Sequence, residues 1–270
     1  MSCAVTHMAN LLVTNDDGVE SKLWSRLCDA LQAAGHHVYG LAPARDQSWI
    51  SSAQTISREL MASEISPGRF SLDGTPSDCA AVAPALWPGV AFDAVVSGIN
   101  IGVNTRLPLV LTSGTVGAAS TGAMLGYRAI AFSYAMPREF SAEAKKNGGL
   151  VPQTLASTDS MIAHCVARVS RLLGEPNVFG RVLNVNFPSA VTAQTAWETT
   201  SLALTPMLQY FKKTDSGKFI HDPKLGQPLN AGRTEFHVIG EGKISETVID
   251  WPSIGYSNAA TPRATSVASY

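Results

Sequence analysis

The chain has 270 residues, enough for one large domain or two small ones, and a formal net charge of −1. A charge so near zero leaves no broad basic surface, so neither nucleic acid nor an anionic membrane is expected as a partner. Charged residues make up 15% of the chain, against a usual share of about 25%. We therefore expect a weakly charged surface, part of it covered by a second subunit.

The location of the protein is predicted from what its sequence lacks. No apolar run approaches the ~20 residues of a membrane-spanning helix, and the first residues do not form a basic segment followed by a long apolar stretch. The four cysteines are scattered without CxxC or Cys/His metal spacing, at Cys3, Cys28, Cys79 and Cys165. These features predict a cytoplasmic location.

Strand and helix patterns alternate from residue 11 to Pro188. Buried strands are expected at 11–14, 38–42, 94–97, 129–133 and 182–187, and helices at 21–34, 79–87, 113–125 and 152–173. One or two short strands are expected near 54–60 and 70–72, and a surface insert at 139–149. Because strand–helix–strand crossovers place their strands parallel, the pattern predicts an α/β fold with a largely parallel, doubly wound sheet.

The alternation ends after Pro188. Residues 190–250 mix polar residues, glycine and proline, with strand-like pieces at 236–239 and 246–249. This composition predicts an extended arm or hairpin that packs on a neighbouring subunit and has no core of its own. The expected division is a core at 8–190 and an oligomerisation arm and tail at 191–270.

The first strand ends in two adjacent carboxylates, Asp16 and Asp17, followed by Gly18. Two carboxylates at a buried edge repel each other, which favours a cation beside them. A solvated Asp-Gly turn is the alternative, because Asn, Asp and Gly are ordinary turn residues.

Further polar side chains follow other strands of the predicted sheet. In a doubly wound sheet, ligands bind beyond the carboxyl ends of the strands. Four oxygen-bearing residues are expected at that edge: Asp16, Asp17, Ser48 and Asn100. An all-oxygen set suits Mg²⁺, Mn²⁺ or Ca²⁺ and holds zinc or copper poorly. Taken singly, Ser48 could cap a turn, and Asn100 and Asn104 could be left-handed turn residues.

An anion site is predicted where a small-residue helix begins at Ser113, Gly114 and Thr115. The free N–H groups and positive dipole end of a helix attract phosphate, although these residues could equally be a simple helix cap. A divalent cation that faces an anion site favours phosphoryl chemistry.

Together these segments resemble the SurE (survival protein E) family of divalent-metal-dependent phosphatases and nucleotidases. The resemblance is carried, in order, by residues 13–18, 43–48, 74–79, 96–104, 113–116 and 183–188. A weaker similarity lies at 255–257 and 261–262. Several ordered motifs are far more specific than any one of them.

The resemblance implies a Rossmann-like three-layer α/β/α core with a C-terminal extension that is swapped between subunits, giving a homodimer or homotetramer. It assigns the metal ligands to Asp16, Asp17, Ser48 and Asn100, the four residues already placed at the edge. It assigns phosphate contacts to Ser113, Gly114 and Thr115, with Asn104 nearby. Family members hydrolyse nucleoside monophosphates, and some act on other phosphomonoesters or on polyphosphate.

The resulting hypothesis is a 5′/3′-nucleotidase-like phosphomonoesterase that acts on a small phosphorylated substrate. Asp16 and Asp17 would be the catalytic residues, since one of them would also position or deprotonate the attacking water. The cofactor would be one Mg²⁺ or Mn²⁺, with Ca²⁺ as an alternative ion in crystals. A broad-specificity acid phosphatase or polyphosphatase, and a non-catalytic nucleotide- and metal-binding protein, are the alternatives.

The chain departs from the bacterial pattern of the family in three places. The loop before Ser48 lacks a second basic residue, Ser52 stands where asparagine or histidine is common, and residues 105–111 contain Pro108 and no acidic residue. These departures affect the expected substrate preference and leave the metal site intact.

Two other enzyme classes fit less well. A phosphatase of the haloacid dehalogenase type would need Asp-x-Asp after the first strand, whereas here the carboxylates are adjacent. A dinucleotide-dependent oxidoreductase would need G-x-G-x-x-G, whereas residues 15–18 place negative charge where a pyrophosphate would lie.

Overall fold

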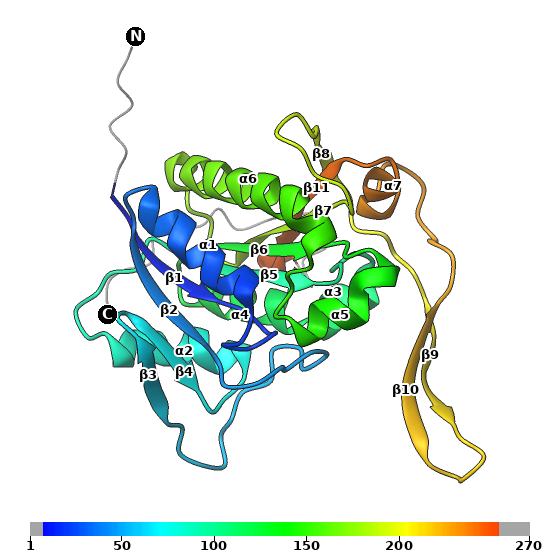
Figure 1. Cartoon of the computed structure of the whole chain (residues 1–270), viewed down its shortest axis with the longest axis horizontal. Coiled ribbons are helices and arrows are strands. Elements are labelled where there is room, and N and C mark those ends of the chain that lie inside the picture. Colours follow the sequence, from blue (N-terminus) through cyan, green and yellow to red (C-terminus); the bar gives the residue numbers. More distant parts are fainter. Residues whose placement is uncertain (1–7, 254–270) are drawn as a thin grey trace.

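A computed structural model of the chain describes residues 8–253, so the weak motif at 255–262 lies outside the described residues. One nine-stranded sheet runs through the molecule (Figure 1), in the order β3-β4-β2-β1-β5-β6-β7-β11-β8. Its central strands are β1 (Asn10–Thr14), β2 (His37–Pro43), β4 (Arg69–Leu72), β5 (Ala94–Ile101), β6 (Arg128–Tyr134) and β7 (Arg181–Phe187). These six are mutually parallel, which confirms the predicted α/β fold.

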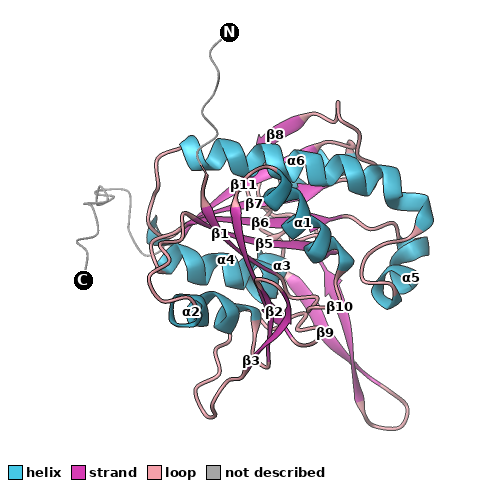
Figure 2. Cartoon of the chain, turned by 60° about the vertical axis from the view of Figure 1, so that its left-hand side comes forward, coloured by secondary structure: helices cyan, strands magenta, loops and turns pink. Residues whose placement is uncertain are grey.

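Helices cover both faces of this sheet (Figure 2). One face carries α1 (Lys22–Ala33) and α6 (Leu155–Gly174), and the other carries α2 (Pro76–Leu86) and α4 (Gly114–Met124). Buried apolar side chains fill the space between each helical layer and the sheet. The three-layer arrangement follows from strands that are apolar on both faces and therefore need a helical layer on each side.

Local sequence signals fix the ends of these helices. Ser21 caps α1 and accepts a hydrogen bond from the Trp24 N–H. Thr75 and Asp78 form a capping box at the start of α2, with Pro76 in its first turn. Thr75, Pro76 and Asp78 lie within four residues of one another, so the start of this helix is encoded locally.

Several shorter elements differ from the sequence-based expectation. The strand expected near 54–60 lies instead at β3 (Ala62–Ser66), antiparallel to β4. Two short helices, α3 (Leu107–Thr112) and α5 (Ser141–Lys146), occupy segments with no predicted helix. The piece expected as a strand at 236–239 is helix α7 (Glu235–Gly240). Its apolar run is too short to separate the two periodicities, and packing against β11 decides its conformation.

The largest difference concerns the end of the core. The sequence predicts that the core ends at residue 190, but the sheet continues through β11 (Ile244–Asp250) and β8 (Trp197–Thr200). β11 pairs antiparallel with β7, and β8 pairs parallel with β11. Part of the segment at 191–250 therefore completes the sheet, because a strand added at an open edge gains a full hydrogen-bond ladder without long apolar periodicity of its own.

Only a hairpin in this segment extends away from the body (Figure 1). It consists of β9 (Met207–Lys213) and β10 (Phe219–Leu225), which pair antiparallel. Its exposed apolar side chains are Leu208, Tyr210, Phe211, Phe219 and Ile220. In the described part of the chain, 3₁₀ helices occur at η1 (Arg138–Phe140), η2 (Pro152–Thr154) and η3 (Trp251–Ser253). Within residues 8–253, no helix combines the length and the apolarity needed to cross a membrane.

A buried ion pair ties β11 to α6. The side chain of Arg168 is 2% exposed and binds both oxygens of Glu246, while a second carboxylate, Glu175, lies 3.1 Å from its Nη1. Breaking such a pair leaves a buried charge without its closest partner, which costs about 3–5 kcal/mol.

We therefore expect Glu246→Ala to lower the free energy of unfolding by about 3 kcal/mol, measured by urea denaturation. Glu175→Ala is the matched control and should cost less, because the Glu175 side chain is 38% exposed. Equal effects of the two substitutions would contradict the role assigned to Glu246.

Candidate active site

The candidate site begins at the turn that follows β1. Asn15 closes this turn on itself, since its side-chain amide donates to the Gly18 carbonyl and its Oδ1 accepts from the Gly18 N–H. Gly18 has a φ of +87°, and a Cβ there would lie 2.8 Å from the carbonyl carbon of Arg45. Only glycine fits this close approach of two loops. The turn is therefore built to hold Asp16 and Asp17 in fixed positions.

Asp16 is buried against the start of α4. It is 3% exposed, and the Thr115 hydroxyl donates a hydrogen bond of 2.5 Å to its Oδ1. Gly114 packs directly on it, because a Cβ at Gly114 would lie 2.8 Å from the Asp16 Cβ. Burial raises the pKa of Asp16 to about 6, although the hydrogen bonds from Thr115 act in the opposite direction.

Asp17 is half-buried beside the end of β5. Its Oδ2 accepts a hydrogen bond of 3.1 Å from the Ile101 N–H. Burial, and then the charge of Asp16, raise the pKa of Asp17 well above its usual value, whereas Lys145 acts to lower it. The two carboxylates are thus costly to ionise together without added positive charge.

Asn100 follows a β-bulge in β5. The pairing of β5 with β6 shifts register between Ser97 and Asn100. Gly98, inside this shift, has a φ of +132°, and a Cβ there would clash with the carbonyl oxygen of Phe132. A bulge re-aims the side chains that follow it. The Asn100 amide nitrogen donates to the Gly102 carbonyl over 2.8 Å, and within residues 8–253 its Oδ1 accepts no hydrogen bond.

Ser48 lies on the exposed loop after β2. Both its N–H and its hydroxyl donate to Asp46 Oδ1, over 2.7 and 2.6 Å. The loop itself is anchored to the first site turn, because the Gln47 N–H donates to the Asp16 carbonyl over 2.8 Å. Ser48 is therefore held near Asp16 with the lone pairs of its Oγ available.

One cavity of about 430 Å³ brings most of the predicted site residues together. It is lined by Asp16, Ser48, Asn100, Asn104 and Ser113, and also by Trp49, Lys145 and His221. Asp17 lines a neighbouring cavity of about 320 Å³, and Ile101 and Lys145 belong to the walls of both. The edge residues chosen from the sequence thus meet around two adjoining cavities.

The predicted phosphate-contacting residues differ in which of their hydrogen-bonding groups are available to a ligand. Ser113 caps α4 by accepting the Val116 N–H over 3.1 Å, so its hydroxyl proton can still be donated. The hydroxyl of Thr115 is already bound to Asp16, and Gly114 offers only its backbone. A phosphate in the cavity would therefore meet the Ser113 hydroxyl more readily than the Thr115 hydroxyl.

Asn104 is fixed by a buried polar network. Its amide nitrogen donates to Ser133 Oγ over 2.8 Å, and its N–H donates to Asn186 Oδ1 over 2.8 Å. The side-chain amides of Asn184 and Asn186 both donate to its carbonyl. Such a network makes its members cooperatively rigid, which gives the two asparagines of β7 a positioning role that the sequence alone did not reveal.

Three further cavity residues were missed in the sequence. Lys145 lies in the segment expected as a surface insert, and His221 lies on the hairpin expected to face a neighbour. Trp49 lies next to Ser48 but was not assigned a role. No spacing rule connects these residues to the carboxylates, because only the tertiary fold brings α5 and β10 to this edge.

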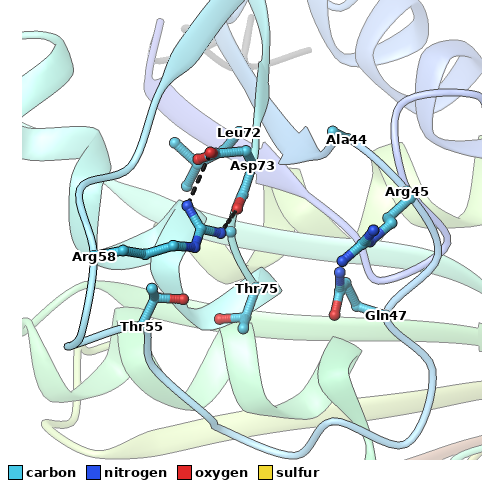
Figure 3. A pocket seen from close by; sticks show the side chains of 9 residues that line it. Ala44, Arg45, Gln47, Thr55, Arg58, Leu72, Asp73 and Thr75 are labelled. Carbon is cyan, nitrogen blue, oxygen red and sulfur yellow. Dashed lines mark hydrogen bonds and ion pairs between the residues drawn. The ribbon is translucent and has the colours of Figure 1, made fainter.

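A separate cavity of about 420 Å³ is lined in part by Ala44, Arg45 and Gln47, which precede Ser48 (Figure 3). Arg58 closes part of it, since its guanidinium donates to Asp73 Oδ2 over 2.8 Å. Arg45 and Gln47 extend into it from the loop that carries Ser48. This cavity contains none of the predicted site residues.

The donor set at the edge fits a hard divalent cation. It offers two carboxylates, one amide oxygen and one hydroxyl. The raised pKa values of the two carboxyl groups mean that their ionised forms are disfavoured, and a bound cation would stabilise these forms. No cluster of three or more His, Cys, Asp or Glu suitable for a metal occurs in the described part of the chain.

Thr115→Val tests the support that α4 gives to Asp16. Loss of the hydroxyl removes the hydrogen bond to Oδ1 and lets the carboxylate rotate. We expect a loss of about 10- to 100-fold in divalent-cation affinity or in turnover. Thr121→Val is the matched control, because the Thr121 hydroxyl bonds only to the Gly117 carbonyl of its own helix. If Thr115→Val leaves both the cation affinity and the turnover unchanged, Thr115 does not support Asp16 in binding the cation.

Comparisons with known proteins agree with this architecture. The family model described as Survival protein SurE matches residues 11–211. A protein named 5′-nucleotidase SurE from Vibrio parahaemolyticus is 34% identical over 248 residues, covering 90% of this chain and 88% of the relative. One of the same name from Methanospirillum hungatei is 33% identical over 257 residues, covering 92% and 88%.

A solved structure shares the fold. The SurE protein from Aquifex aeolicus superposes with a TM-score of 0.72 at 24% sequence identity, and the match covers 89% of this chain and 93% of that one. At this level of identity the likeness concerns the fold alone.

Proposed function

This chain belongs to the SurE family, and we propose that it hydrolyses nucleoside monophosphates with a divalent cation held by Asp16, Asp17, Ser48 and Asn100. It is a metal-dependent phosphoric monoester hydrolase of the 5′-nucleotidase type. The observation that carries the proposal is the pair of adjacent, raised-pKa carboxylates beside a cavity that also contains Asn100, Ser113 and Lys145.

The cation is Mg²⁺ or Mn²⁺ in this proposal. When bound, such a cation lowers the pKa of a water molecule and polarises a phosphoryl oxygen. Asp16 and Asp17 hold it, and one of them also orients the attacking water and accepts its proton. Burial raises the pKa of Asp16 to about 6 when no cation is present, and the positive charge of a bound cation would act in the opposite direction.

The remaining residues bind the phosphate. The Ser113 hydroxyl donates to one phosphate oxygen, and Asn104, held rigid by Asn184 and Asn186, borders the same cavity. Gly114 and Thr115 do not line this cavity in the described structure, and they act by supporting Asp16: Gly114 packs on its side chain, and the Thr115 hydroxyl donates to it. Lys145 adds a positive charge to the wall of the cavity. This charge stabilises the negative charge that develops on the phosphate oxygens during hydrolysis.

A substrate panel tests the proposed reaction. Purified protein with Mg²⁺ or Mn²⁺ should release phosphate from nucleoside monophosphates, and kcat/KM for these should exceed that for sugar phosphates and polyphosphate. Release from polyphosphate alone would favour the alternative of a polyphosphatase. The absence of turnover on the whole panel would refute the enzymatic function.

A homo-oligomer and a cytoplasmic location are also part of the proposal. The oligomer is supported by the exposed apolar side chains of the β9–β10 hairpin, which would be covered by a second copy of the chain. The location is supported by the buried, unpaired thiols of Cys28, Cys79 and Cys165, since free cysteines are usual in a reducing compartment.

Light scattering of the intact protein is expected to give a mass of at least two chains at micromolar concentration. Removal of residues 207–225 should reduce this mass, because that hairpin carries the exposed apolar surface. A monomeric intact protein would contradict the oligomer without affecting the assignment of the reaction.

A further inference from the structure

Two aromatic side chains meet in the wall of the catalytic cavity. Trp49 follows Ser48 on the loop after β2, and His221 lies on β10 of the projecting hairpin. Their ring centroids are 4.3 Å apart at an interplanar angle of 74°, and both residues line the cavity that Asp16 and Asn100 also line. The hairpin therefore contributes directly to the site.

The backbone holds Trp49 in an unusual conformation. Its φ is +64°, a left-handed value that is rare for a bulky side chain, and Ser51 repeats this with +59°. The surrounding structure fixes the loop, because the Ser51 N–H and hydroxyl donate to the carbonyls of Thr112 and Leu111 over 2.9 and 2.7 Å. Trp49 is nevertheless 37% exposed. The strained backbone thus presents an indole to the cavity instead of burying it in the core.

His221 continues this aromatic surface along the hairpin. Its ring contacts Phe211 on β9, with centroids 5.4 Å apart, as well as Trp49. His221 is exposed and lines the cavity, so part of its ring is accessible there. The wall also contains the apolar residues Ile101, Val103 and Leu109. Its polar part includes Asp16, Asn100 and Ser113, where the phosphate and its cation would lie.

A cavity that is polar and cation-binding in one part and aromatic in another fits a ligand with the same two parts. We propose that Trp49 and His221 form a stacking surface for the nucleobase, and so select nucleoside monophosphates over aliphatic phosphomonoesters. A volume of about 430 Å³ lies in the usual range for a small-molecule site. Stacking tolerates every base, because each presents a π face, so selection concerns the presence of a base and not its identity. This inference rests on the proposed nucleotidase function.

The test compares His221→Ala and Trp49→Ala with the parent in the full-length protein. The two substrates are adenosine 5′-monophosphate and ribose 5-phosphate, which share the phosphate and the sugar and differ in the base. We expect kcat/KM for the nucleotide to fall by about 10- to 100-fold, mainly through KM. The value for ribose 5-phosphate should change by less than about threefold, and Trp49→Phe should restore most of the loss.

Ile220→Ala is the matched control. Ile220 is an exposed apolar residue next to His221, but its side chain points to the opposite face of β10. It should leave both substrates unaffected. Equal losses for nucleotide and ribose 5-phosphate in His221→Ala, or no loss for either, would overturn the stacking surface.

Equilibrium binding separates this inference from the proposed reaction. Calorimetric titration of the parent and of His221→Ala with adenosine 5′-monophosphate in excess chelator, where turnover is suppressed, measures binding without hydrolysis. A weaker Kd in the variant alongside an inactive parent would refute the nucleotidase reaction and support the stacking surface. An unchanged Kd would overturn the stacking surface even if the enzyme is active.

Discussion

Turnover of nucleoside monophosphates should fall by at least about three orders of magnitude in excess chelator and return when Mg²⁺ or Mn²⁺ is added. The physical reason lies in Asp16 and Asp17: burial raises the pKa of both carboxyl groups, and the charge of Asp16 further raises the pKa of Asp17. Without a cation the raised pKa values favour protonation of these groups. The positive side chains in the walls of the two cavities are those of Lys22, Lys145 and Lys146.

The measurement is phosphate release by metal-stripped protein, with residual metal determined in the same sample. Zn²⁺ serves as the control ion, since an all-oxygen ligand set should bind it poorly relative to a site with histidine or cysteine. Full turnover by protein with less than about 1% of one metal per chain would contradict a metal-dependent reaction.

Asp17→Asn is expected to reduce kcat at least about 1,000-fold while leaving the fold intact. The amide oxygen can still accept the Ile101 N–H, so the local hydrogen bond is preserved. The negative charge needed for the cation and for the attacking water is lost. Glu20→Gln is the control, because Glu20 is an exposed carboxylate three residues along the same loop.

The same substitution should also stabilise the metal-free protein at neutral pH. Folding raises the pKa of both carboxyl groups, to about 6 for Asp16. Above pH about 4 the folded state therefore binds more protons than the unfolded state, so stability falls as the pH rises through the raised pKa values. Removing one of the two charges should therefore raise the free energy of unfolding of the metal-free protein, on the order of 1–3 kcal/mol at pH 7.5.

Urea denaturation in chelator at pH 4.5 and pH 7.5 measures this effect. The variant should be at least as stable as the parent at pH 7.5, and the difference should shrink at pH 4.5. A variant that is much less stable than the parent at pH 7.5 would show that Asp17 has a structural role.

The parts of the fold that could be predicted are those with strong local signals. The apolar strands up to β7 and the cap at Thr75 follow from periodicity and from the chemistry of helix ends. The edge at which Asp16, Ser48 and Asn100 meet follows from parallel topology alone, because the carboxyl ends of parallel strands share one edge.

The parts that could not be predicted depend on long-range packing. β8 and β11 join the sheet through backbone pairing with a strand far away in the sequence, and their own residues carry weak periodicity. The short run at 236–239 becomes helix α7 because it packs against β11. Local propensity is a weak guide for such short segments.

The site shows the same division between local and tertiary information. The carboxylates were found because their adjacency is itself a chemical signal. Lys145 and His221 reach the cavity from α5 and β10, and each would pass in the sequence as an ordinary surface residue. The buried network around Asn104 depends on the register of β7 against β6, which no single segment encodes.

Anomalous scattering from crystals grown with Mn²⁺ tests the central claim most directly, because it locates the cation without reference to activity. We expect one peak per chain, with oxygens of Asp16, Asp17, Asn100 and Ser48 at about 2.0–2.6 Å or linked to it through one water. In Asp17→Asn crystals grown in the same solution, the peak should weaken or vanish. A fully occupied peak elsewhere in an active protein, with these four side chains free of metal, would contradict the account.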